Sequence, residues 1–204
     1  MRITKNILPI LLIAGFINSC GFARQEEAEP QRYNESRYTN MQPIEFNISK
    51  IDVVSEFTPS FRAPNVEHRF PVSIERTAKL WANDRLEAVS PNSDKIATFT
   101  IKDASVTETT EKSDRAFYKD SLIYRATLHV VLEVSDTKSI SRAQTEINAW
   151  RELKIPVDTS VEEKDRYWND MVQKLFDEFN VKMEQQIHQY LNMHIKNSSF
   201  IKEF

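Results

Sequence analysis

The chain has 204 residues, with 27 Lys and Arg against 30 Asp and Glu and a formal net charge of −3. This length fits one domain, and the mildly acidic balance argues against a general nucleic-acid-binding protein, which would carry a basic face. Because the chain has only two glycines, it cannot build a glycine-rich phosphate-binding loop. Its single cysteine excludes an internal disulfide, a cysteine-rich zinc site and a CxxC redox pair.

Residues 1–19 have the pattern of a bacterial signal peptide. Arg2 and Lys5 precede an uncharged apolar run over residues 7–17. This run has the length of a signal-peptide hydrophobic region and is too short to span a bilayer as a helix. The sequence therefore predicts export from the cytoplasm.

The signal region ends in the tetrapeptide INSC, whose last residue is Cys20. This resembles the lipobox of bacterial lipoproteins, although Asn18 stands where that motif has a small or β-branched residue. The resemblance implies cleavage between Ser19 and Cys20 and attachment of palmitate and related lipid to Cys20. An ordinary secretory signal and an uncleaved anchor are the alternatives. Gly21 after the cysteine implies an outer-membrane anchor facing the periplasm, with the inner membrane as the alternative.

Residues 20–42 are polar and poor in aliphatic side chains. Such a segment cannot bury enough apolar surface to offset its ordering entropy, so we expect a flexible tether after the lipidated cysteine. The tether is expected to lead to a single α+β domain at 43–204.

The first half of the domain is expected to hold one strand, one irregular connection and one helix. Alternating apolar residues from 44 to 48 indicate a strand, and the parity shift that follows indicates either a bulge or the end of one strand face. Prolines interrupt residues 57–71, and Ser73 then provides an N-cap for a helix to about residue 89.

Arg85 lies within the apolar stripe of this predicted helix. It could extend over the edge of the core with its charge in water, form a partly buried ion pair with a strand carboxylate such as Asp103, or bind an anion. These three interpretations stay open at the level of the sequence.

The second half is expected to hold three strands. The longest alternation runs over 122–134 and predicts a central strand with one solvated face. A strand over 97–106 shifts parity at Asp103, and a strand over 143–153 places its odd-numbered side chains inward. Trp150 should therefore point away from the core.

A capping box at Ser160 and Glu163 predicts the start of a helix that extends to about residue 195. The predicted order is therefore β-α-β-β-β-α. A four-stranded, mostly antiparallel sheet with both helices on one face would bury both apolar helix stripes.

The titratable side chains form no catalytic or metal-binding pattern in the sequence. Glu184 and His188 are one helical turn apart, but no further ligands accompany them, so we interpret the pair as structural. His129, on the solvated face of the central strand, has no nucleophile beside it in the sequence. We expect no enzymatic activity, no bound metal and no cofactor.

Three segments of the domain resemble a known family. The segments VEHRFP and WANDRLEAV, followed by ATFTIKDASVTE, resemble uncharacterised alphaproteobacterial envelope lipoproteins. The predicted element order also resembles auxiliary lipoproteins of envelope transport, such as the lipopolysaccharide-assembly lipoprotein and ABC-transporter auxiliary lipoproteins. These resemblances imply an envelope protein and supply no catalytic residues.

The predicted function is that of a membrane-anchored, non-enzymatic adaptor or stabilising subunit of an envelope transport or cell-wall assembly. Trp150 is the candidate contact for its protein partner, unless this side chain merely packs across the strands of the outer face. The alternative function is a periplasmic carrier of lipid or another amphiphile. Its ligand would lie between the long helix and the sheet, against Phe176, Phe179 and Met183.

Overall fold

The computed structural model describes residues 32–114 and 119–196. The described residues form one compact unit, and Ser19 and Cys20 lie outside them. The elements of the described chain are β1 (Ile44–Phe46), β2 (Lys50–Ser55), η1 (Glu67–Arg69), α1 (Ile74–Arg85), β3 (Leu86–Ala88), β4 (Lys95–Asp103), β5 (Val106–Glu111), β6 (Ser121–Asp136), β7 (Arg142–Pro156), α2 (Val161–Tyr190) and η2 (Asn192–His194).

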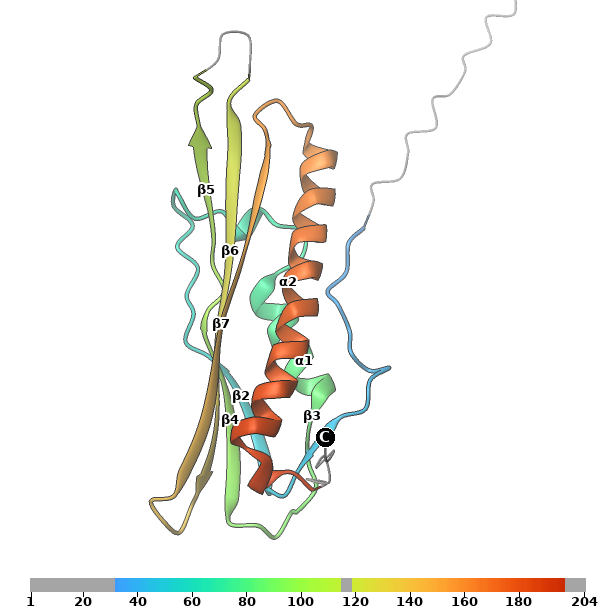
Figure 1. Cartoon of the computed structure of the whole chain (residues 1–204), viewed down its shortest axis with the longest axis vertical. Helices are drawn as coiled ribbons and strands as arrows, with labels where there is room; N and C mark the ends of the chain where they lie inside the picture. Colours follow the sequence, from blue (N-terminus) through green and yellow to red (C-terminus); the bar gives the residue numbers. More distant parts are fainter. Residues whose placement is uncertain (1–31, 115–118, 197–204) are drawn as a thin grey trace, which may run out of the picture. The chain divides into compact units, whose positions relative to one another are not determined.

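The long strand β6 is the centre of the main sheet (Figure 1). β7 pairs antiparallel with one edge of β6 along its full length, whereas β4 and β5 pair one after the other with the opposite edge. β2 extends the sheet by pairing parallel with β4. The main sheet of the described chain therefore has five strands, where the sequence predicted four.

Two of the extra strands arise because two predicted strands each divide, the one over 97–106 into β4 and β5. The strand expected from residue 44 becomes β1, which pairs parallel with β3 in a small second sheet, and β2, which joins the main sheet. Between them the amide of Asn47 donates to the carbonyl of His194 and that of Ser49 to Lys95. These partners are distant in the sequence, so local periodicity could not decide between a bulge and the end of a strand.

The alternation in β6 produces the buried layer that was predicted. Its even-numbered apolar residues face the core, with Tyr124, Leu128 and Leu132 fully buried, and the odd-numbered residues lie on the outer face. The predicted parity change is also confirmed, since the pairing of β4 with β6 shifts register between Ile101 and Asp103.

Both helices cover the same face of the main sheet, as predicted, but each is shorter than expected (Figure 1). α1 begins where the Ser73 hydroxyl accepts from the amide of Arg76 at 3.2 Å, and it ends at Arg85 instead of residue 89. The next residues, Leu-Glu-Ala, favour helix locally, but they pair as β3 with β1. Tertiary pairing therefore overrides local preference.

α2 begins at the predicted cap, where the Ser160 hydroxyl accepts from the amide of Glu163 at 3.3 Å. It ends at Tyr190, five residues before the expected end, because the following chain turns to form an antiparallel bridge between Ile195 and Phe46. The chain after α2 thus connects the end of the long helix to strand β1 of the small sheet by hydrogen bonds.

Candidate functional site

Trp150 lies on the outer face of the sheet, on the side that the sequence predicted. It is opposite Thr127 of β6, and 53% of its surface is exposed. The guanidinium carbon of Arg125 lies 4.4 Å from the centre of the indole ring, within the range of a cation–π contact. Trp150 is therefore an exposed aromatic side chain on a rigid strand.

Ionisable side chains surround this tryptophan and lie close to one another in pairs. Arg125 also contacts Glu152 at 3.2 Å, and Nε2 of His129 lies 3.8 Å from a carboxylate oxygen of Glu146. Such exposed pairs contribute little to stability, because water competes for each charge. The outer face thus presents one large aromatic ring within a charged surface of mixed sign, which we call the Trp150 surface.

Arg85 lies in the core, only 2% exposed, where α1, α2 and the N-terminal segment meet. Its guanidinium donates to Oε2 of Glu184 at 2.6 Å, to Oδ1 of Asn180 at 3.2 Å and to the carbonyl of Gln42. The indole nitrogen of Trp81 donates to the same Asn180 oxygen at 2.9 Å.

One interpretation of Arg85 is therefore wrong, and the ion pair is formed with a different partner from the example given. Its charge does not extend into water, and its partner is a helix carboxylate of Glu184 instead of Asp103 on a strand. The ion pair itself is confirmed. The error has a simple cause, since only the packing of α1 against α2 brings positions 85 and 184 together.

The expected tether is partly folded onto the domain. Tyr38 is only 7% exposed, and its amide donates to Oδ2 of Asp84 at 2.9 Å. Arg37 contacts Oδ1 of the same carboxylate at 2.7 Å. Hydrogen bonds from Arg37 hold the pKa of Asp84 below its ordinary value, although burial opposes this. At least Arg37 and Tyr38 of the predicted tether thus contact the domain, and residues 20–31 lie outside the described chain.

The carrier hypothesis placed a ligand against three side chains of α2. Phe176, Phe179 and Met183 are fully buried in the hydrophobic core of the described domain. Their packed side chains therefore occupy the place where that ligand was expected.

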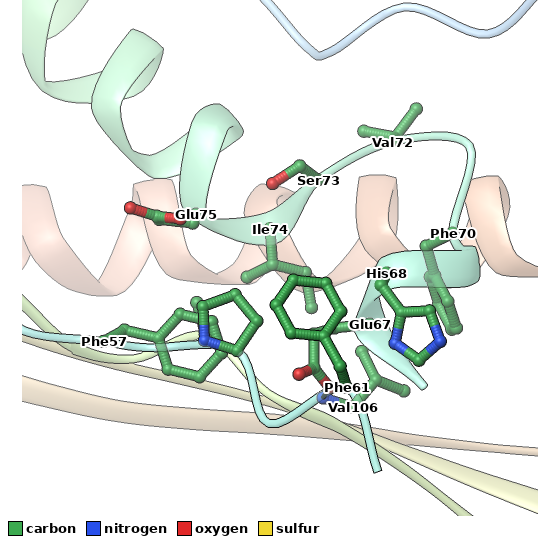
Figure 2. A pocket seen from close by; sticks show the side chains of 12 residues that line it. Phe57, Phe61, Glu67, His68, Phe70, Val72, Ser73, Ile74, Glu75 and Val106 are labelled. Carbon is green, nitrogen blue, oxygen red and sulfur yellow. Dashed lines mark hydrogen bonds between the residues drawn. The ribbon is translucent and has the colours of Figure 1, made fainter. Parts of the chain in front are cut away.

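A different cavity, of about 220 Å³, lies beside β5 and the first turn of α1 (Figure 2). Three phenylalanines line it, together with the carboxylate of Glu67 and the side chain of His68. The phenylalanines are Phe57, Phe61 and Phe70. The cavity was not predicted from the sequence, because its residues come from the proline-interrupted connection, β5 and α1. The concentration of phenylalanines in a segment without regular structure was the available signal.

The remaining titratable groups form no metal site in the described residues. Within 32–114 and 119–196, no group of three or more His, Cys, Asp or Glu side chains is placed to hold a metal ion. Glu184, half of the pair considered in the sequence, is engaged by Arg85. None of the helices that the structure describes is long and apolar enough to cross a membrane.

No protein-family model and no curated protein matches the chain, so the resemblance to alphaproteobacterial lipoproteins stays a prediction. The solved structures to which it is similar include a minor lipoprotein from Acinetobacter baumannii (10% identity, TM-score 0.38, covering 68% of this chain and 90% of that one). A protein from Xanthomonas campestris is 9% identical, with a TM-score of 0.34 and coverage of 76% and 95%. Rare lipoprotein B from Shewanella oneidensis is 13% identical, with a TM-score of 0.26 and coverage of 66% and 98%. Because these TM-scores are below 0.5, the similarities establish neither a fold nor a function.

Proposed function

We propose that this chain is a lipid-anchored protein of the bacterial envelope that acts as a non-enzymatic adaptor and docks a protein partner on the Trp150 surface. The exposed indole of Trp150 carries the proposal. Tryptophan and arginine are enriched among residues that dominate binding energy. Here the guanidinium of Arg125 lies over the face of the Trp150 ring. A ring fixed on a strand loses little side-chain entropy on binding.

The anchor supports this function by confining the domain to a membrane surface. Lipid on Cys20 would be joined to the folded unit through residues 21–31, a connection of at most about 40 Å when fully extended. Two or more acyl chains hold a protein on a membrane stably, whereas one chain binds only marginally. Such confinement favours contact with a partner in the same membrane, because the effective concentration of the two proteins rises.

Photo-crosslinking in intact cells tests the docking surface. A photoreactive residue replaces Glu152, beside Trp150, and in a matched control it replaces Val161, an exposed residue at the start of α2. We expect one adduct of defined mass from position 152 and none from 161, and the adduct should disappear when Trp150→Ala is added. Equal adducts from both positions, or an adduct that survives Trp150→Ala, would reject the proposed surface.

Metabolic labelling with palmitate tests the anchor. The wild-type chain should incorporate label and remain in the membrane fraction, whereas Cys20→Ser should lose the label. Separation of inner from outer membranes then shows which membrane holds it. An unlabelled wild-type chain would contradict the lipid anchor.

A further inference from the structure

The cavity beside Phe61 has a wall of aromatic rings, some of which are rigidly held. Phe70 stacks on Trp168 with ring centres 4.7 Å apart and an interplanar angle of 12°, and it meets Tyr124 edge-on at 6.3 Å. Phe57 forms another part of the wall, on the connection after β2. The faces of aromatic rings carry partial negative charge and attract cations.

Phe61 lines this cavity with an exposed side chain and a strained backbone. Its side chain is 68% exposed, and its backbone φ of 53° lies in the left-handed region, which is strained for a bulky residue. The ring lies 5.5 Å from that of His68. Residues held in strained backbone conformations cluster at active sites and ligand-binding sites.

Glu67 adds a fixed negative charge to the lining. Its Oε1 accepts from the amide of Ser60 at 3.2 Å and its Oε2 from the amide of Val106 at 3.4 Å. A carboxylate has about four acceptor positions, so these two bonds orient the group and leave capacity for a ligand. Figure 2 shows Glu67 among the same group of side chains as Phe61.

The charged groups of the lining determine whether the cavity favours a positively or a negatively charged ligand. The first turn of α1 has a partial positive charge, but the Ser73 hydroxyl accepts one of its amides and Glu75 lies within it. Nζ of Lys79 lies 2.6 Å from Oε1 of Glu75 and pairs with this carboxylate. Glu67 is the other carboxylate of the lining, and among the described contacts it is bonded by backbone amides and by no basic side chain. An anion would therefore meet a like charge, whereas a cation would meet both this carboxylate and the rings.

We propose that this cavity binds a protonated amine or guanidinium group carried on a short apolar stem. Its volume of about 220 Å³ is below the range typical of pockets for drug-sized ligands, so it fits one such group and little more. The group belongs either to a free alkylamine or to a lysine or arginine side chain of a polypeptide. The site shares no residue with the Trp150 surface and does not depend on the adaptor function.

Titration of the full-length chain in detergent, followed by NMR, tests the site. The probes are n-butylguanidinium and its uncharged analogue n-butylurea, and the reporters are the amides of Ser60 and Val106, which donate to Glu67. We expect saturable shifts of both amides with butylguanidinium, and binding of butylurea about tenfold weaker or more.

Three variants separate a cation site from a merely apolar hollow. Phe61→Leu keeps apolar bulk without the ring and Glu67→Gln removes the charge, and each should weaken butylguanidinium binding about tenfold. Glu162→Gln, at an exposed position in the first turn of α2, should leave it unchanged. Because Phe61 is exposed, Phe61→Leu keeps the test valid should Glu67→Gln fail to fold.

Some results would overturn the proposal. These are equal binding of butylurea, wild-type affinity in Phe61→Leu, or the absence of saturable shifts at Ser60 and Val106. A second titration with a blocked Ala-Arg-Ala peptide identifies the source of the group. Tighter binding of the peptide than of butylguanidinium indicates a polypeptide side chain, and weaker binding indicates a free amine.

Discussion

Two arginine–tryptophan pairs occupy opposite environments in this domain. Arg85 and Trp81 are buried and share the side-chain oxygen of Asn180, whereas Arg125 and Trp150 stack on the outer face of the sheet. In the core a hydrogen-bond donor without an acceptor strongly destabilises the folded state. The acceptors therefore determine how the side chains of Arg85 and Trp81 are oriented. On the outer face water can serve each donor. The same two residue types are therefore part of the hydrogen-bonded core in one place and form an exposed surface in the other.

The largest effect is expected from removing the packing around the buried tryptophan. Phe179 is fully buried and meets the Trp81 ring edge-on, with centres 5.0 Å apart. Phe179→Ala should reduce the free energy of unfolding by about 3–5 kcal/mol, measured by urea denaturation. Lys174→Ala, on the exposed side of the same helix, should change it by less than about 0.5 kcal/mol. Equal effects of the two substitutions would contradict the assigned core face of α2.

The next effect comes from leaving the buried arginine without its carboxylate. Glu184→Leu should destabilise by about 2–3 kcal/mol, less than for a fully buried pair, because 43% of the Glu184 side chain is exposed. The double variant Arg85→Leu with Glu184→Leu should recover part of this loss, since no unpaired charge remains. As a matched control, Glu178→Leu removes the solvent-exposed partner of Arg151 and should cost less than about 1 kcal/mol. A similar loss for Glu184→Leu and Glu178→Leu would show that burial of the arginine does not increase the cost of removing its carboxylate partner.

A smaller effect, dependent on pH, is expected where the N-terminal segment attaches. Because Arg37 lowers the pKa of Asp84 in the folded state, this carboxylate stabilises the fold above its unfolded pKa of about 3.9. The contribution is lost as the pH falls through the lower folded pKa. Asp84→Asn should therefore reduce stability by about 1 kcal/mol at pH 7 and by much less near pH 2, measured by urea denaturation. A difference that stays constant between these pH values would exclude a role for the charge of Asp84.

The sequence predicted those parts of the fold that local periodicity determines. The alternation over 122–134 located the central strand and its buried face, and the odd–even rule placed Trp150 outward on the neighbouring strand. Both helix starts were predicted as well, since Ser73 and Ser160 form local caps with residues three positions later.

The features that the sequence missed depend on contacts between distant segments. β3 forms from good helix formers because β1 lies beside it, and the N-terminal segment is ordered because Asp84 binds Arg37 and the amide of Tyr38. The cavity beside Phe61 likewise combines a connection, a helix start and a strand. The composition of the N-terminal segment shows only that it is polar and could not predict its contact with α1.

The smallest stability effect is expected at the outer tryptophan, and there the consequence should be functional instead. Trp150→Ala removes one cross-strand contact and one exposed cation–π contact, which together should contribute about 1 kcal/mol or less to the free energy of unfolding. A double-mutant cycle with Arg125→Ala measures how much of this comes from the pair itself. The adaptor proposal requires that Trp150→Ala folds normally and still loses the crosslinked partner. A loss of more than about 2 kcal/mol would instead make Trp150 a part of the core, and the contrast between the two arginine–tryptophan pairs would disappear.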